Sequence, residues 1–198
     1  MTVDWRLLDE ISYRSRLDKS LKNNLNKFDK NRLFCELNNM IAHFTVAAGQ
    51  LQHEHRVKSL QSCRLKYDKY YPSRSVEKPF NDVLGIRVVL DSYAEIGEMS
   101  LPNNVRVVDM RTGKANDDGY RGVHLYYQKD HIHYPIEIQY MSFDDHRFNE
   151  WLHTYCYKLI DDAKLGQMLR AKYEQRIIVS EDDFRKELDY VLSDSKKI

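Results

Sequence analysis

The chain has few of the residues that disulfide-rich, zinc-binding or membrane-spanning proteins need. Its three cysteines, Cys35, Cys63 and Cys156, lie far apart and form no CxxC pair, so neither a disulfide framework nor a thiolate zinc site is expected. No segment approaches the ~18 consecutive apolar residues of a membrane-spanning helix. The first ten residues, MTVDWRLLDE, are interrupted by charge. We therefore expect no signal peptide and no membrane anchor, and a reducing cytoplasm as the location.

The chain also lacks an excess of charge of either sign. It has 31 basic and 30 acidic residues, so it has no general attraction to nucleic acid or to a membrane, and any site for a polyanion has to be local. Its 198 residues can bury one core but are too few for two ordinary domains. The sequence predicts a single domain over residues 1–198.

Hydrophobic periodicity predicts helices at both ends of this domain. In a helical N-terminal region, residues 1–60, one or two short helices are expected over 4–30 and a long one over about 32–59. The long helix rests on apolar residues at steps of three and four, namely Phe34, Leu37, Ile41, Phe44, Ala48 and Leu51. After residue 141, Ser142 with Asp145 and Ser180 with Asp183 have capping-box spacing. Helices are therefore expected to close the chain, including residues 161–198.

The region between the helices, within a core over residues 61–160, has the sequence pattern of strands. Four segments are short, rich in β-branched and aromatic residues, and separated by Gly, Pro, Asn and Asp. They are residues 83–90, 103–110, 122–129 and 134–141, and residues 63–69 are a candidate fifth strand. A short crossover helix is expected at 92–99. The pattern predicts an α+β fold with a five-stranded sheet flanked by helices.

Two carboxylates stand out because strands fix their direction. Asp82 lies at the entrance of the first of these strands, and Glu137 projects with Gln139 from one face of the last. If these strands are neighbours, the two carboxylates can share a magnesium ion. The alternative for Asp82 is a turn cap, and for Glu137 a solvated strand face.

Two further segments could bind phosphates or bases. In NDDGYRGVHLYY, residues 116–127, Gly119 and Gly122 permit close backbone approach, Tyr120 offers a ring for stacking, and Arg121 and His124 can meet phosphate. Residues 56–78 hold seven basic side chains, and in the expected strand Arg64 and Lys66 share a face. The seven are Arg56, Lys58, Arg64, Lys66, Lys69, Arg74 and Lys78. A tight turn and a solvated basic face are the alternatives.

In order and spacing, five motifs resemble the synthetase domain of RelA/SpoT enzymes over about residues 56–160. They are RLK (64–66), FNDVLGIRVV (80–89), GYRGVH (119–124), IEIQ (136–139) and H-x-x-x-Y-K (153–158). The length is similar to that of single-domain small alarmone synthetases, and nothing resembles the hydrolase domain of the long family members.

The resemblance implies a nucleotidyltransferase-like mixed sheet and a pyrophosphoryl transfer from ATP. It implies that Asp82 and Glu137 bind Mg²⁺, that Glu137 helps to activate the acceptor hydroxyl, and that Tyr120 stacks on the acceptor base. It places Arg64, Lys66 and Arg87 near ATP, with one of Lys69, Arg74 or Lys78 as a further ATP ligand. Arg121, His124 and Gln139 complete the implied acceptor side.

Departures from the family pattern bear on the acceptor. IEIQYMS lacks the arginine-threonine that commonly follows, and GYRGVH has Gly-Val where Ser-Leu is usual. These changes resemble the toxic small synthetases of toxin-antitoxin pairs. That resemblance implies the tRNA 3′ CCA end as acceptor, or in some members an adenosine nucleotide, and an antitoxin as possible partner. Residues 14–32 hold seven basic and two acidic side chains, and on helices they could hold an RNA backbone. The basic residues we expect to do so are Arg16, Lys19, Lys22 and Lys27.

Two other functions stay open. The first is a synthetase of guanosine alarmones, with GDP or GTP as acceptor, and the second is an inactive synthetase fold that binds an antitoxin or RNA. The presence of both carboxylates favours an enzyme.

Overall fold

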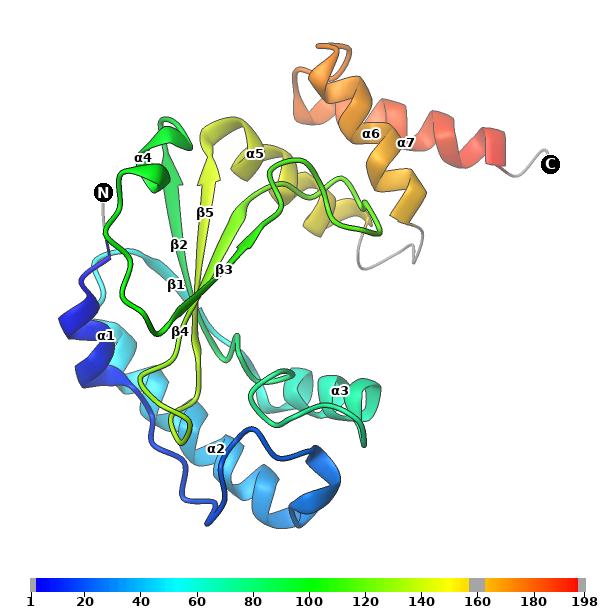
Figure 1. Cartoon of the computed structure of the whole chain (residues 1–198). Coiled ribbons are helices and arrows are strands. Elements are labelled where there is room, and N and C mark those ends of the chain that lie inside the picture. The colour runs from blue at the N-terminus through cyan, green and yellow to red at the C-terminus, as the bar shows by residue number, and fades with distance from the viewer. Residues whose placement is uncertain (1–2, 157–162, 196–198) are drawn as a thin grey trace. The chain divides into compact units, whose positions relative to one another are not determined.

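The computed structural model describes residues 3–156 and 163–195. A mixed sheet of five strands has the order β1-β2-β5-β4-β3 (Figure 1). The strands are β1 (Glu54–Val57), β2 (Leu84–Leu90), β3 (Val105–Asp109), β4 (Val123–Tyr127) and β5 (Ile136–Ser142). The α-helices are α1 (Trp5–Ile11), α2 (Lys30–Ala47), α3 (Leu60–Tyr70), α4 (Ala94–Gly97), α5 (Phe143–Trp151), α6 (Ala163–Glu174) and α7 (Glu181–Ser195). The predicted α+β class is confirmed.

The four strands predicted from alternation are all present. In β2, Leu84 and Ile86 are buried while Gly85 and Arg87 are only half-buried, and β4 alternates in the same way. One face of the sheet is therefore apolar and belongs to the core, while the other presents polar side chains. The expected crossover helix is the short α4.

The predicted strand over 63–69 is wrong, because this segment is part of α3. Ser59 caps the helix by accepting a hydrogen bond from the backbone N–H of Ser62 at 3.2 Å. The helix contains no Val, Ile or Thr. The fifth strand is instead β1, which pairs antiparallel with β2. Arg64 and Lys66 consequently do not share a face, because residues two apart on a helix point to different sides.

The predicted helix over 32–59 is too long. Asp29 caps α2 by accepting from the N–H of Arg32 at 2.8 Å, and the α-helix ends at Ala47. A 3₁₀ turn, Ala48–Gln50, then leads into β1. The apolar spacing continues to Leu51 although the helix does not, because the chain must turn here to pair with β2.

Between α1 and α2 the chain is mostly non-helical, so the helical surface expected over residues 14–32 is wrong for most of that segment. A 3₁₀ turn covers Leu25–Lys27. The backbone instead bonds to the turn before β5, with the N–H of Ser15 donating to Ile132 at 2.8 Å and that of Leu21 to His131 at 3.1 Å. These partnerships satisfy the backbone groups without a helix.

The closing helices agree with the prediction. Ser142 caps α5 by accepting from the N–H of Asp145 at 3.2 Å, and Ser180 accepts in the same way from Asp183 ahead of α7. Phe184, Leu188 and Val191 of α7 are buried. Of the helices within the described ranges, none has the length and apolar character needed to cross a membrane.

Contacts divide the chain into two compact units, and each has its own core. The first unit comprises Met1–Val88, Ala94–Val108 and His124–Tyr140, and the second Val89–Tyr93, Asp109–Val123 and Met141–Ile198. In the first unit, Tyr13 packs against Phe44 and Tyr134. In the second, Phe148 packs against Tyr173 and Phe184.

Candidate active site

The polar face of the sheet in the first unit centres on Glu137. Its side chain is only 8% exposed, which excludes the alternative of a solvated strand face. Tyr126 donates to Glu137 Oε1 at 2.8 Å, Gln139 donates to Oε2 at 2.8 Å, and His124 Nδ1 lies 3.1 Å from Oε1. A Cβ at Gly85 would lie 3.7 Å from Oε2, so Glu137 also sits against β2.

These hydrogen bonds decide the protonation state of Glu137. Burial raises the pKa of this carboxyl, but the interactions with His124, Tyr126 and Gln139 outweigh burial and lower the pKa to about 2. A carboxylate with so low a pKa accepts a proton poorly at neutral pH. Glu137 is therefore ionised at neutral pH and carries a negative charge that attracts cations.

Asp82 is the centre of a second cluster in the same unit. Its Oδ2 accepts from Lys66 at 2.7 Å and also from Lys58. The Lys58 side chain is 8% exposed, and burial lowers its pKa although Asp82 acts in the other direction. Asp82 Oδ1 is buried and has no hydrogen-bond partner in the described part of the chain. A buried oxygen atom that has no hydrogen-bond partner is suited to binding a ligand.

Asp82 and Glu137 belong to one electrostatic cluster. Asp82 lies two residues before β2, Glu137 lies in β5, and these two strands are neighbours in the sheet. Burial lowers the pKa of Lys66, but attraction to Asp82 and to Glu137 outweighs it and the pKa lies above the ordinary value. Burial raises the pKa of Tyr126, and both carboxylates raise it further, so the hydroxyl keeps its proton. The pKa values of Lys66 and Tyr126 are thus each influenced by both Asp82 and Glu137.

Tyr126→Phe tests how Glu137 is held. The substitution removes one of the hydrogen bonds that stabilise the carboxylate, so we expect the pKa of Glu137 to rise from about 2 toward its ordinary 4.5. The ring and its packing are kept. Titration of the labelled Glu137 carboxyl carbon by NMR measures the shift, and an unchanged titration curve would show that the hydroxyl contributes nothing.

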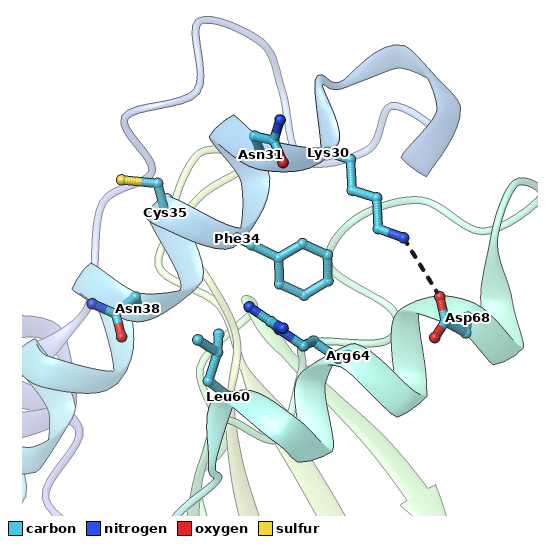
Figure 2. Close-up of a pocket in the computed structure, with 8 residues that line it drawn as sticks. All are labelled: Lys30, Asn31, Phe34, Cys35, Asn38, Leu60, Arg64 and Asp68. Atoms are coloured by element: carbon cyan, nitrogen blue, oxygen red, sulfur yellow. Dashed lines mark ion pairs between the residues drawn. The ribbon is translucent and has the colours of Figure 1, made fainter.

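The structure does not gather all the predicted ATP-binding residues. Arg64 lies in a cleft of about 650 Å³ between α2 and α3, where its guanidinium carbon is 5.5 Å from the Phe34 ring centroid (Figure 2). Lys66, two residues on, lies at Asp82. Lys69 is 6.0 Å from the Tyr70 ring, and the Arg74 carbonyl accepts from the N–H of Leu25.

Two other members of the predicted ATP-binding set lie elsewhere in the first unit. Arg87 donates to Glu54 Oε1 at 2.8 Å across the β1–β2 pair. It alternates with Ile86 and so lies on the same side of β2 as Gly85. Lys78 lines a cleft with Arg106 and Tyr126.

Tyr120 and Arg121 belong to the second unit. Lys114 Nζ lies 4.8 Å from the Tyr120 ring centroid and pairs with Asp118 at 2.7 Å. Arg121 forms two hydrogen bonds with Asp117, at 2.7 and 3.0 Å. The charge of Arg121 is therefore paired with Asp117. The ammonium group of Lys114 lies over one face of the Tyr120 ring.

Gly119 has a packing role that differs from the ligand approach expected of it. Its φ of +82° is in the left-handed region, and a Cβ here would lie 2.3 Å from the carbonyl oxygen of Gly166 in α6. Arg170 of α6 is 2% exposed and donates to the Gly119 carbonyl at 2.8 Å and to Asp145 at 2.7 Å. Helix α6 thus fixes the backbone beside Tyr120.

The predicted RNA-binding cations are exposed and lie in irregular chain, bends and turns, not on an α-helix. Arg14 and Arg16 alternate with the buried Tyr13, Ser15 and Leu17, so they project from one side. Further along, Lys19 donates to the carbonyl of Lys27, which is in the 3₁₀ turn, and Lys22 is exposed. Of the last motif in the sequence, His153 is described, while Tyr157 and Lys158 fall outside the described residues.

Three residues of this site were not singled out by the sequence. Lys58 was one of seven basic residues, with nothing to mark it as the buried one. Tyr126 had a signal, because strand alternation places it on the same face as His124. Arg106, on β3, lies 4.2 Å from the Tyr126 ring centroid and had no signal.

Comparisons with known proteins bear on the family of the chain. The model of a family described as the region found in RelA/SpoT proteins matches residues 55–162 of the 198. No curated protein matches.

Several solved structures are similar to the chain. Small alarmone synthetase 1 from Bacillus subtilis, bound to its product pppGpp, is 18% identical over 84% of this chain and 92% of its own, with a TM-score of 0.47. Small alarmone synthetase 2 from the same organism is 19% identical over 84% and 96%, with a TM-score of 0.46. A GTP pyrophosphokinase family protein from Streptococcus pneumoniae is 19% identical over 95% and 98%, with a TM-score of 0.43. The family match covers more than half of the chain and includes Asp82 and Glu137, and the chain therefore belongs to the RelA/SpoT family.

Proposed function

We propose that this chain transfers a pyrophosphoryl group from ATP to the 3′ hydroxyl of a guanosine nucleotide, with AMP as the leaving group. The family makes the chain a pyrophosphokinase. The observation that carries the assignment of the site is that Asp82, which accepts from Lys66 at 2.7 Å just before β2, and the buried Glu137 of the neighbouring strand β5 lie in one part of the sheet. The acceptor and the role of each residue are part of the proposal.

The cluster has the charges that this reaction needs. Attack of a 3′ oxygen on the β-phosphorus requires in-line positioning and neutralisation of phosphate charge, without a covalent nucleophile on the protein. Lys66 is bound to Asp82 and about one third exposed, so it can turn to the phosphates of ATP, while the more buried Lys58 remains to hold Asp82. Lys66 would thereby contact ATP, and Lys58 would hold Asp82 in place.

Magnesium fits the oxygen atoms that are present. Asp82 Oδ1 has no partner within the described residues, and Glu137 stays ionised. No group of three or more His, Cys, Asp or Glu side chains suited to a metal occurs in the part of the chain that the structure describes. This agrees with Mg²⁺, which is often held by one or two carboxylates together with substrate phosphates. When bound by Asp82 and Glu137, the ion would neutralise phosphate charge.

Identification of the labelled product tests this function. The protein is incubated with Mg²⁺, γ-labelled ATP and either GDP or deacylated tRNA. We expect label in a guanosine product and AMP in equal amount, because the transferred group carries the γ-phosphate. The Asp82→Asn variant is the control for contaminating kinases. Absence of AMP with either acceptor would reject the proposal.

Transfer to the tRNA 3′ end is the second candidate. One observation favours it, namely the exposed cations of residues 14–27, which include Arg16, Lys22 and Lys27. Exposed cations that follow one another along a loop can contact a phosphate backbone, and such binding weakens as salt rises. This candidate is supported if label appears only in tRNA and is lost when these three residues are changed to glutamate. The acceptor would then be tRNA and not a guanosine nucleotide.

A further inference from the structure

A second cleft in the first unit adjoins both carboxylates and has no place in the reaction so far. It has a volume of about 220 Å³ and is lined by Lys78, Asn81, Asn103, Arg106 and Tyr126, among others. Asn81 directly precedes Asp82, and Tyr126 donates to Glu137 at 2.8 Å. A ligand in this cleft would therefore lie next to the candidate catalytic residues.

The charges of this cleft are not paired within the protein. Across the ranges that the structure describes, neither Lys78 nor Arg106 forms an ion pair. The guanidinium of Arg106 instead stacks on Tyr126 at 4.2 Å, a contact that orients it and leaves its N–H groups available. Arg111, Arg121 and Arg170, by contrast, each bind a carboxylate. The cleft thus presents two cations that are available for an anion.

The other polar groups indicate what kind of anion fits. Asn81 and Asn103 add amide donors beside the two cations. Glu77 also lines the cleft, and its Oε2 is buried without a hydrogen-bond partner while Oε1 accepts from Ser75 at 3.0 Å. Cations with amide donors suit a phosphate group, and a lone carboxylate oxygen suits a hydroxyl donor. A ribose phosphate carries both.

We propose that this cleft binds the 5′ phosphate end of the acceptor nucleotide. The inference rests on the proposed function, which supplies a nucleotide acceptor and already assigns Lys66 to the donor. An acceptor anchored at Arg106 and Lys78 is held by the end opposite to its reacting 3′ hydroxyl. Affinity would then depend on the number of its 5′ phosphates, whereas ATP would be held elsewhere.

Binding without turnover tests the cleft separately from the reaction. Calorimetry measures guanosine, GMP and GDP, and an ATP analogue with a methylene between the α- and β-phosphorus, which cannot release AMP. We expect GDP to bind more tightly than guanosine. Arg106→Met should weaken GDP binding about tenfold, because a charge-assisted hydrogen bond is lost. The affinities for guanosine and for the ATP analogue should stay unchanged. Methionine keeps an apolar stem over Tyr126.

Two further variants make the test specific. Arg106→Lys should regain part of the GDP affinity because it restores the charge. Lys186→Met removes an exposed cation from α7 and should change nothing. The inference is overturned if guanosine and GDP bind equally to the unsubstituted protein, or if Arg106→Met weakens the ATP analogue instead of GDP. Phosphate-dependent binding of GDP with no transfer to any acceptor would reject the proposed function and keep the cleft.

Discussion

Replacement of Glu137 by glutamine is expected to reduce pyrophosphoryl transfer by about a thousandfold or more. The substitution keeps the size of the side chain and removes a charge that His124, Tyr126 and Gln139 stabilise in the native protein. Charge stabilisation of this kind is usually the largest single contribution to catalysis. Release of AMP from ATP in the presence of GDP measures the loss.

Controls separate this effect from damage to the fold. Glu10→Gln removes the same charge from the exposed surface of α1 and should retain full turnover. The melting temperature of Glu137→Gln should stay within a few degrees of the unsubstituted protein, because an amide oxygen can still accept from Tyr126 and Gln139. Turnover within about threefold of the unsubstituted protein would remove Glu137 from the mechanism.

Asp82→Asn is expected to cost both activity and stability. Lys58 is 8% exposed and would lose its carboxylate partner, and breaking such a buried pair typically costs about 3–5 kcal/mol of unfolding free energy. Urea denaturation measures this loss. A loss below about 1 kcal/mol would mean that water or Glu137 replaces Asp82 as the partner.

The pH dependence of this variant identifies Lys58 as the cause. Burial lowers the pKa of Lys58 below its ordinary 10.5, and removal of Asp82 takes away an interaction that raises it. Between the lowered pKa and 10.5 the unfolded chain then binds more protons than the native protein, so the stability of Asp82→Asn should rise with pH in this range. The double variant Asp82→Asn, Lys58→Met should regain stability but no turnover. Recovery of turnover would refute the role of Asp82.

The strands and the two carboxylates could be predicted because strand alternation is a strong local signal. Glu137 and Gln139 share a face in any strand that contains them, and Asp82 precedes an apolar run that can only be buried. The burial of Glu137 was not predictable, because it depends on His124 and Tyr126 of β4, a strand whose pairing a single sequence does not show.

The errors arose where local signals were weak or misleading. Residues 63–69 were predicted as a strand although Ser59 and Ser62 have the spacing of a helix cap. Strand β1 was missed because Glu54, His55 and Arg56 are exposed and have no apolar pattern. Lys58 lies between β1 and α3, so this misassignment hid its place beside Asp82 and led to the expectation that Arg64 and Lys66 share a strand face.

The close approach of Gly119 to Gly166 has a consequence for variants far from the reacting atoms. With 2.3 Å between a virtual Cβ and a carbonyl oxygen, neither glycine tolerates a side chain unless the backbone moves. A change in α6, or removal of this helix, would therefore reshape the loop that presents Tyr120. If Tyr120 stacks on the acceptor base, as the family resemblance implies, substitutions in α6 are expected to alter the use of the acceptor more than the use of ATP.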